Sequence, residues 1–142
     1  MSYSLSFSKA LLVVIFVSDK VRQNQFDFLS TSSISEILNI PKPTLVKILQ
    51  SLTAEGILET KEGKFGGIRL VKNPSDLTVL DVFNAIEKGK PLFNSAFDIS
   101  VSGQRPDKAQ LLLKELFNAT EQKMKNELAS KNIAEILNEM GK

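Results

Sequence analysis

The sequence predicts a mainly α-helical fold with one small β-hairpin, and three observations support this prediction. Apolar residues recur at spacings of three and four along most of the chain, which is the period of an amphipathic helix. Near the middle, two short runs with strand character flank a turn that contains three glycines. The length of 142 residues is enough for one domain with its own core and a short appendage.

The first predicted helix runs from Ser8 to about Arg22, and its apolar residues cover nearly the whole circumference. We therefore expect it to be buried on most sides. Its longest apolar run, Ala10 to Val17, is far shorter than the roughly 20 residues that span a bilayer, and no small-x-small cleavage site follows it. We expect a cytoplasmic protein with no membrane partner. The alternation in Phe26 to Leu29 predicts a short strand.

A second, short helix is expected to begin in the serine-rich segment 30–33, which can supply an N-cap. Ser33 and Glu36 have the spacing of a capping box, in which each side chain bonds the backbone amide of the other residue. The turn that follows, residues 39–43, contains two prolines. The predicted inner face of this second helix consists of Ile34, Ile37 and Leu38.

The third predicted helix opens at Pro43, because proline is tolerated in the first helical turn, and it runs to about Glu55. Gly56 is expected to end it in the left-handed conformation. Four residues at helical spacing form its predicted inner face: Leu45, Ile48, Leu49 and Leu52.

Leu58 to Lys61 and Ile68 to Val71 are predicted to pair as strands, with Gly63, Gly66 and Gly67 allowing positive φ angles in the connecting turn. Two short helices followed by a basic hairpin form the order of a winged helix-turn-helix. In this arrangement the second of the two helices can enter the DNA major groove, while the hairpin, or wing, lies along the backbone.

After the wing, Thr78 is predicted to cap a fourth helix that Gly89 and Pro91 end, and residues 92–104 carry no regular pattern. Pro106 and Asp107 then start a long helix, and a short last helix follows it. We divide the chain into a winged helix-turn-helix DNA-binding domain, residues 1–90, and a second part, residues 91–142. The second part contains a linker loop, a long dimerisation helix and a short terminal helix.

The candidate DNA-binding residues lie on the third helix and on the wing. Lysines near the start of that helix can donate to guanine, a threonine methyl can pack on thymine, and wing cations can neutralise phosphates. From Ser33 to Lys72 there are six basic and four acidic residues, a modest excess of positive charge. The candidates are Lys42, Pro43, Thr44 and Lys47 on the helix, and Lys61, Lys64, Gly66, Gly67 and Arg69 on the wing.

Four points stay open here. The helix face can be an ordinary solvated face, and the hairpin can carry its charges for solubility alone. Phe65 at the turn can pack either on a DNA sugar or on Lys64. The whole module can also bind a protein partner instead of DNA, although protein docking does not require three cations on one hairpin.

The long helix must bury its apolar stripe, and a second copy of the chain is the expected partner. A homodimer places two reading helices on a two-fold DNA operator. The alternative is that the stripe folds back on its own domain. The predicted dimerisation residues are Leu112, Leu113, Leu116, Phe117, Met124 and Leu128.

The chain contains no cysteine and no histidine. This excludes disulfides, thiolate zinc sites, cysteine-ligated clusters and catalysis by histidine. The carboxylates form no catalytic motif, so an enzyme is not predicted, and nothing in the sequence calls for a cofactor or a metal.

The order of these elements resembles the Rrf-two family of bacterial winged-helix regulators, the group that includes IscR, NsrR and CymR. The most specific segment is Asn73 to Val82, because a generic winged helix does not need this continuation into the fourth helix. The other matching segments are Ser6 to Leu11, Ile34 to Leu52, Glu55 to Leu58 and Gly66 to Leu70.

The resemblance implies a dimeric transcription regulator, usually a repressor, that binds DNA through the third helix and the wing and dimerises through the long helix, aided by the first. Cluster-binding members carry three cysteines between the fourth helix and the long helix, where this chain has none. Ile68 stands where many members have an aromatic residue. The chain therefore resembles the cluster-free branch, and its signal is a small molecule, a protein partner or nothing.

Overall fold

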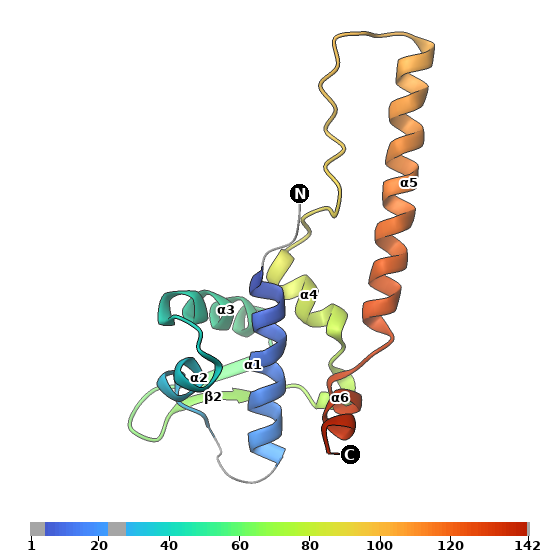
Figure 1. The fold of residues 1–142 in the computed structure, drawn as a ribbon. Helices are drawn as coiled ribbons and strands as arrows, with labels where there is room; N and C mark the ends of the chain where they lie inside the picture. Colours follow the sequence, from blue (N-terminus) through green and yellow to red (C-terminus); the bar gives the residue numbers. More distant parts are fainter. Residues whose placement is uncertain (1–4, 23–27, 142) are drawn as a thin grey trace.

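The computed structural model describes residues 5–22 and 28–141, and it confirms the predicted fold class (Figure 1). Helices make up most of the chain, and the named strands form one two-stranded antiparallel sheet. Within the described residues, no helix is both long and apolar enough to cross a membrane. The elements are α1 (Leu5–Arg22), α2 (Thr31–Leu38), α3 (Lys42–Ala54), β1 (Leu58–Lys61), β2 (Gly67–Leu70), the 3-10 helix η1 (Pro74–Asp76), α4 (Val79–Glu87), α5 (Gln104–Ala129) and α6 (Ile133–Met140).

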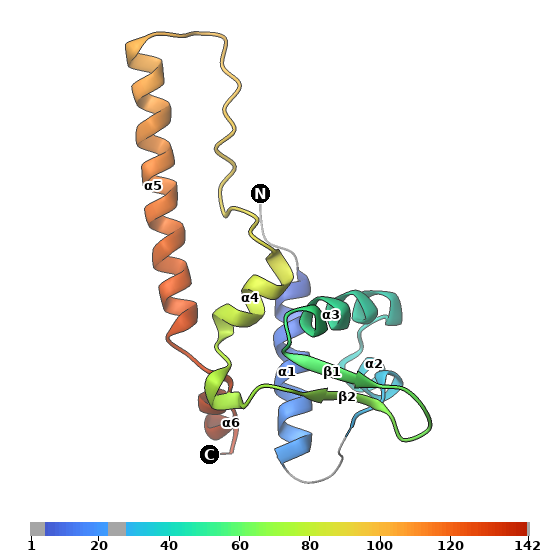
Figure 2. The same cartoon turned by 180° about the vertical axis from the view of Figure 1, so that it is seen from behind.

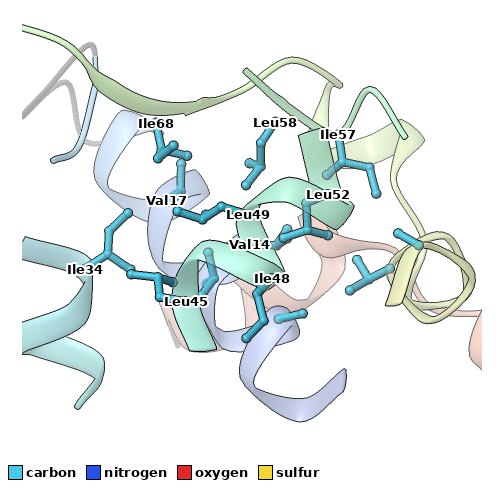
Figure 3. Packing of buried hydrophobic residues seen from close by; sticks show 14 of the residues in the cluster. Val14, Val17, Ile34, Leu45, Ile48, Leu49, Leu52, Ile57, Leu58 and Ile68 are labelled. Atoms are coloured by element: carbon cyan, nitrogen blue, oxygen red, sulfur yellow. The ribbon is translucent and has the colours of Figure 1, made fainter. Parts of the chain in front are cut away.

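The core forms around α1, which contacts α3, α4, α6 and β2. Ala10, Val13, Val14 and Val17 of this helix are fully buried, as the apolar run predicted. Figure 3 shows Val14 and Val17 within the same cluster as the inner side chains of α3 and the two strands. Burying each side chain of this size stabilises the fold by about 1.5–3 kcal/mol. The core thus packs the inner face of α3 and strand β2 of the wing against the same helix, α1.

The N-cap of α2 lies in the predicted segment 30–33, but the predicted capping box is not formed. This N-cap is Ser30, whose Oγ accepts a hydrogen bond from the backbone N–H of Ser33 at 3.1 Å. The predicted capping box of Ser33 and Glu36 is therefore wrong, because Ser33 lies inside the helix. The predicted inner face holds for Ile34, which is fully buried, but not for Ile37, which is 61% exposed. Leu38 is half-buried and packs against the core, so Ile37 is the predicted inner residue of α2 that the core leaves exposed.

The wing is an antiparallel pair in which Glu59 lies opposite Arg69 and Thr60 lies opposite Ile68. Strand β2 begins and ends one residue earlier than predicted. On its outer edge, Leu29 and Ile68 exchange two backbone hydrogen bonds of 2.9 and 2.7 Å. The strand predicted for Phe26 to Leu29 is thus seen as a single bridge at Leu29, while its first two residues lie outside the described part of the chain.

The glycines of the wing serve two different needs. Gly63 and Gly67 have φ angles of +104° and +144°, as predicted. The prediction of a positive φ is wrong for Gly66, whose requirement is space. A Cβ on Gly66 would lie 2.0 Å from the backbone oxygen of Lys61, and one on Gly67 would lie 2.2 Å from that of Leu29. Gly66 therefore lies directly against the backbone at the end of β1, and Gly67 lies directly against the backbone before α2.

The fourth helix begins with the predicted Thr78 cap. The Thr78 side chain accepts from the backbone N–H of Asp81 at 3.1 Å, and the Asp81 carboxylate accepts from the Thr78 N–H at 3.0 Å. Helix α6 then returns to this region, since the Ile133 N–H donates to the Leu77 oxygen at 2.8 Å. Ile133 and Leu137 are buried, so α6 is part of the same core as α1.

Helix α5 stands away from this core (Figures 1 and 2). It begins at Gln104, two residues before the predicted Pro106, and none of its 26 residues is buried. Residues 91–103 run as an extended segment from the end of α4 to the start of α5. The base of this segment is attached to α5, because the rings of Phe93 and Phe117 stack with centroids 4.6 Å apart. The Leu92 N–H also donates to the Glu121 carboxylate at 2.5 Å.

Candidate nucleic-acid interface

The turn between α2 and α3 is held by local hydrogen bonds. Asn39 ends α2 in the left-handed conformation, with φ of 52°. The Ile40 N–H donates to the Ser35 oxygen at 3.0 Å, and the Ser35 hydroxyl donates back to the Ile40 oxygen at 2.6 Å. These bonds fix the direction in which the chain enters α3, which sets the angle between the two helices of the motif.

Helix α3 has one buried face and one exposed face. Its predicted inner residues are confirmed, since Leu45, Ile48, Leu49 and Leu52 are all at most 6% exposed. The helix begins at Lys42, and its N-cap Pro41 provides no side-chain hydrogen bond to the first turn. Unpaired amides at a helix start attract anions such as phosphates. Of the predicted reading residues, Lys42, Pro43 and Lys47 are exposed and Thr44 is half-buried.

The wing holds two of its cations on one face. The Arg69 guanidinium pairs with the Glu59 carboxylate at 2.5 Å and lies 4.6 Å from the ring centre of Phe28. Lys61 Nζ lies 5.6 Å from the same ring centre. Phe28 therefore contacts both cations, whereas its sequence pattern predicts only a short strand. The Glu59 pair is about half exposed, so it contributes little to stability.

Lys64 occupies the tip of the wing with Phe65. Its Nζ lies 5.6 Å from the ring centre of Phe65, so in the free protein Phe65 packs on Lys64, one of the two positions left open for it. Phe65 is 82% exposed. Within the described residues, no ion pair is formed by Lys64, in contrast to Arg69. Lys64, like Lys61, is thus a wing cation whose charge no described carboxylate balances.

The start of α3 and the tip of the wing project in the same direction, away from α5 (Figures 1 and 2). A groove of about 590 Å³ lies between the wing tip, α2 and α1, and its lining includes Lys20, Ser30, Ser33 and Lys64. The sequence pattern indicates only a capping role for the serines and gives no signal for Lys20. Their closeness to the wing depends on the bridge at Leu29, which has no strong sequence signal.

The predicted residues therefore fall into three groups. Lys42, Pro43, Thr44 and Lys47 share the start of α3, and Lys61, Lys64 and Arg69 share the hairpin. Gly66 and Gly67 form the end of the hairpin, where they make room for neighbouring backbone. The start of α3 and the basic wing lie on one side of the molecule. Winged helix-turn-helix proteins that bind double-stranded DNA have this geometry.

A family model described as Rrf2, iron-dependent transcriptional regulator, matches residues 4–139. The residues of this chain do not fit an iron site. Cysteine and histidine are absent, and segment 91–103 offers Asp98 as its one carboxylate. Within the described residues, no group of three or more acidic side chains lies close enough to hold a metal ion. The resemblance to the family therefore covers the fold and the DNA-binding elements, not the iron chemistry.

Individual relatives agree with the family match. The chain is 29% identical over 111 residues to YwnA of Bacillus subtilis (strain 168), named as an HTH-type transcriptional regulator, covering 78% of this chain and 83% of that one. Its fold matches that of T. potens IscR with a TM-score of 0.71 and 18% identity over 99% of this chain and 88% of that chain. CymR, the global cysteine regulator of B. subtilis, gives a TM-score of 0.64 and 18% identity, with 97% of each chain covered. The chain belongs to the Rrf2 family and is a DNA-binding transcriptional regulator.

Proposed function

We propose that the protein is a homodimeric repressor, without catalytic activity, that acts in the cytoplasm on a two-fold DNA operator. The start of α3 enters the major groove, where Lys42, Thr44 and Lys47 face the base edges. The wing follows the backbone, with Lys64 on a phosphate. Each protomer reads one half-site, and the pair excludes other proteins from the DNA it covers.

The observation that supports the dimer is the exposed apolar surface on the N-terminal half of α5, which is called its upper half below. Monomeric soluble proteins rarely leave a contiguous apolar patch of this kind in water. On the neighbouring extended segment, Ile99 and Val101 are 50% and 63% exposed. Between 42% and 58% of each side chain is exposed for Leu111, Leu112, Leu113 and Leu116.

The predicted dimerisation residues divide into two sets. Phe117, Met124 and Leu128 are half-buried in the single protomer, and Phe117 is covered by Phe93 of the same chain. Their spacing of seven and four residues places these three side chains on one face of α5. Leu112, Leu113 and Leu116 are exposed, so a second copy is needed chiefly for the upper half of the helix.

A second exposed patch lies on α1. Leu5 and Leu12 are 66% and 53% exposed, and a spacing of seven places them on the same side of the helix. Two-fold symmetry allows the α5 patch of each protomer to cover the α1 patch of its partner. The same contact then forms twice in the interface, once on each side of the two-fold axis. This arrangement uses the apolar surface that a single protomer leaves exposed.

The direct test is selection of genomic fragments with the purified full-length protein, followed by sequencing of the bound DNA. The proposal expects inverted repeats whose half-sites are separated by about one helical turn or a multiple of it. Removing the regulator should raise transcription from the recovered promoters. Single asymmetric sites with one protomer bound would contradict the dimer, and a fall in transcription would contradict repression.

A further inference from the structure

A pocket of about 400 Å³ lies outside the DNA-facing surface, between α1, the end of β2, η1 and α6. Its volume is at the small end of the range of about 300–1,000 Å³ in which proteins hold small molecules. Its inner wall is apolar and consists of Leu70, Pro74, Ala134 and Leu137. Nothing in the DNA-binding or dimer contacts described above uses this space.

One buried polar group adjoins the apolar wall. Ser18 is 3% exposed, and its hydroxyl donates to the Val14 oxygen at 2.7 Å within α1. The hydroxyl proton of Ser18 is therefore already in a hydrogen bond. A ligand does not need an acceptor atom at the inner end of the pocket. The inner end suits an apolar body.

The mouth of the pocket is polar and positive. Lys72, Asn73 and Asn138 contribute to it, all three are exposed, and Lys72 is the one charged residue of the described lining. The Asn73 side-chain oxygen already accepts from the N–H and the hydroxyl of Ser75, at 3.0 and 2.8 Å. This leaves the Asn73 NH2 group as its donor. An ammonium and amide donors at one mouth match a carboxylate.

We propose that this pocket binds a small monocarboxylate with an apolar body, and that this ligand is an effector of the regulator. The apolar body lies against Leu70, Ala134 and Leu137, and the carboxylate lies at the mouth beside Lys72. Such a ligand needs no metal, thiol or histidine, so it is a signal that a chain without cysteine and histidine can detect.

The position of the pocket connects the two working parts of the molecule. Leu70 ends β2 of the wing, and the next residue, Val71, donates its N–H to the Ile57 oxygen just after α3 at 2.9 Å. Ala134 and Leu137 lie on α6, which directly follows α5. A ligand therefore touches the wing strand on one side and the end of the proposed dimer helix on the other.

This regulatory part rests on the proposed function. If the ligand binds one arrangement of these walls more tightly, it changes the affinity for DNA, and DNA changes the ligand affinity by the same factor.

Ligand binding is tested without DNA, by 15N-correlated NMR of the full chain titrated with phenylacetate. Phenylacetamide, which has the same size and no charge, is the matched probe. We expect saturable shifts of the backbone amides of Lys72, Asn73, Ala134 and Asn138, and affinity for phenylacetamide at least about tenfold weaker. No saturable shift up to about 10 mM phenylacetate, or equal affinity for both probes, would overturn the proposal.

Three variants and one control assign the binding to this pocket. Lys72→Ala should weaken phenylacetate to the level of phenylacetamide and leave phenylacetamide unchanged, while Lys72→Arg should retain most of the difference. Ala134→Leu should remove binding of both probes by filling the cavity. If Ala134→Leu fails to fold, the two Lys72 variants still show whether phenylacetate binds in this pocket. Lys108→Ala, on the distant start of α5, should bind both probes like the parent protein, and unaltered binding by Lys72→Ala would refute the site.

The effector role is tested by fluorescence anisotropy with an operator fragment recovered by selection. Saturating phenylacetate should change the DNA Kd by at least about threefold, and Ala134→Leu should abolish the change. Ligand binding with an unaltered DNA Kd would refute the effector role alone. Absence of operator binding with or without phenylacetate would refute the proposed function, while the NMR result would still decide the pocket.

Discussion

Arg69 and Glu59 lie directly opposite each other on the two strands of the wing, and their side chains form an ion pair at 2.5 Å. Cross-strand neighbours of opposite charge stabilise a hairpin modestly. The more important effect is on charge, because the positive charge of Arg69 is largely balanced where it stands. Lys61 and Lys64 form no ion pair in the described part of the chain, and Lys64 lies at the tip of the wing.

Lys64→Ala should therefore weaken binding to all DNA sequences and lower the slope of log Kd against log salt by about 0.9, the value for one lost phosphate contact. Fluorescence anisotropy at four salt concentrations measures both quantities. The matched comparison is the double variant Glu59→Ala with Arg69→Ala, which removes a neutral pair and should keep the parental slope. A parental slope for Lys64→Ala would remove this residue from the backbone contacts.

The cap of α2 gives a prediction about stability. Ser30→Ala removes the side chain that accepts from the Ser33 N–H, so it should lower the free energy of unfolding by about 1 kcal/mol. Ser33→Ala leaves that acceptor in place and should cost much less. Urea unfolding followed by circular dichroism compares the two variants. A larger loss for Ser33→Ala would restore the capping box that the sequence predicted.

The proposed dimer surface gives a prediction about assembly. Leu116→Glu places a charge within the exposed apolar patch of α5 and should produce folded monomers, because a charge without a partner is costly to bury. Sedimentation velocity measures the mass, and circular dichroism checks that the helix content is retained. Gln122→Glu, an exposed position lower on the same helix, is the control and should stay dimeric. Dimers of Leu116→Glu would move the interface elsewhere.

The end of the wing gives a prediction about close packing. Gly67→Ala brings a Cβ within 2.2 Å of the Leu29 oxygen at a φ angle of +144°. It should lower the free energy of unfolding by about 1–3 kcal/mol and disturb the bridge between Leu29 and Ile68. Gly63→Ala is the control, because its φ is also positive but no atom lies within 4 Å of the added Cβ. Equal losses would show that backbone conformation, not crowding, explains the effect.

The sequence predicted best what depends on regular periodicity. The four inner residues of α3 are buried as expected, because a 13-residue helix packed on one side repeats its pattern long enough to be recognised. The N-cap of α2 falls in the predicted segment 30–33, but the capping box was assigned to the wrong serine because several neighbouring serines and a threonine can each cap a helix. The bridge at Leu29 positions the chain just before Ser30, and this bridge pairs residues far apart in the sequence.

The exposure of the candidate lysines was predicted, but the pairing of the wing side chains was not. Lys42, Lys47 and Lys64 stand exposed where the sequence suggested. The partnership of Arg69 with Glu59 depends on strand register, which the number of residues in the turn decides, and the predicted second strand was displaced by one residue. The roles of Phe28 and Lys20 follow from tertiary contacts that no local pattern encodes.

Helix α6 returns to the core beside α1, and this has a mechanical consequence for the spacing of the operator. The lower end of α5 cannot rotate against the winged domain without opening the contacts of Ile133 and Leu137. In the proposed dimer, the distance between the two reading helices is then determined by the angle at which the two α5 helices cross. One residue inserted into the middle of α5 would turn its upper half by about 100°. Such a change would alter which half-site separation is bound and leave the half-site sequence unaltered.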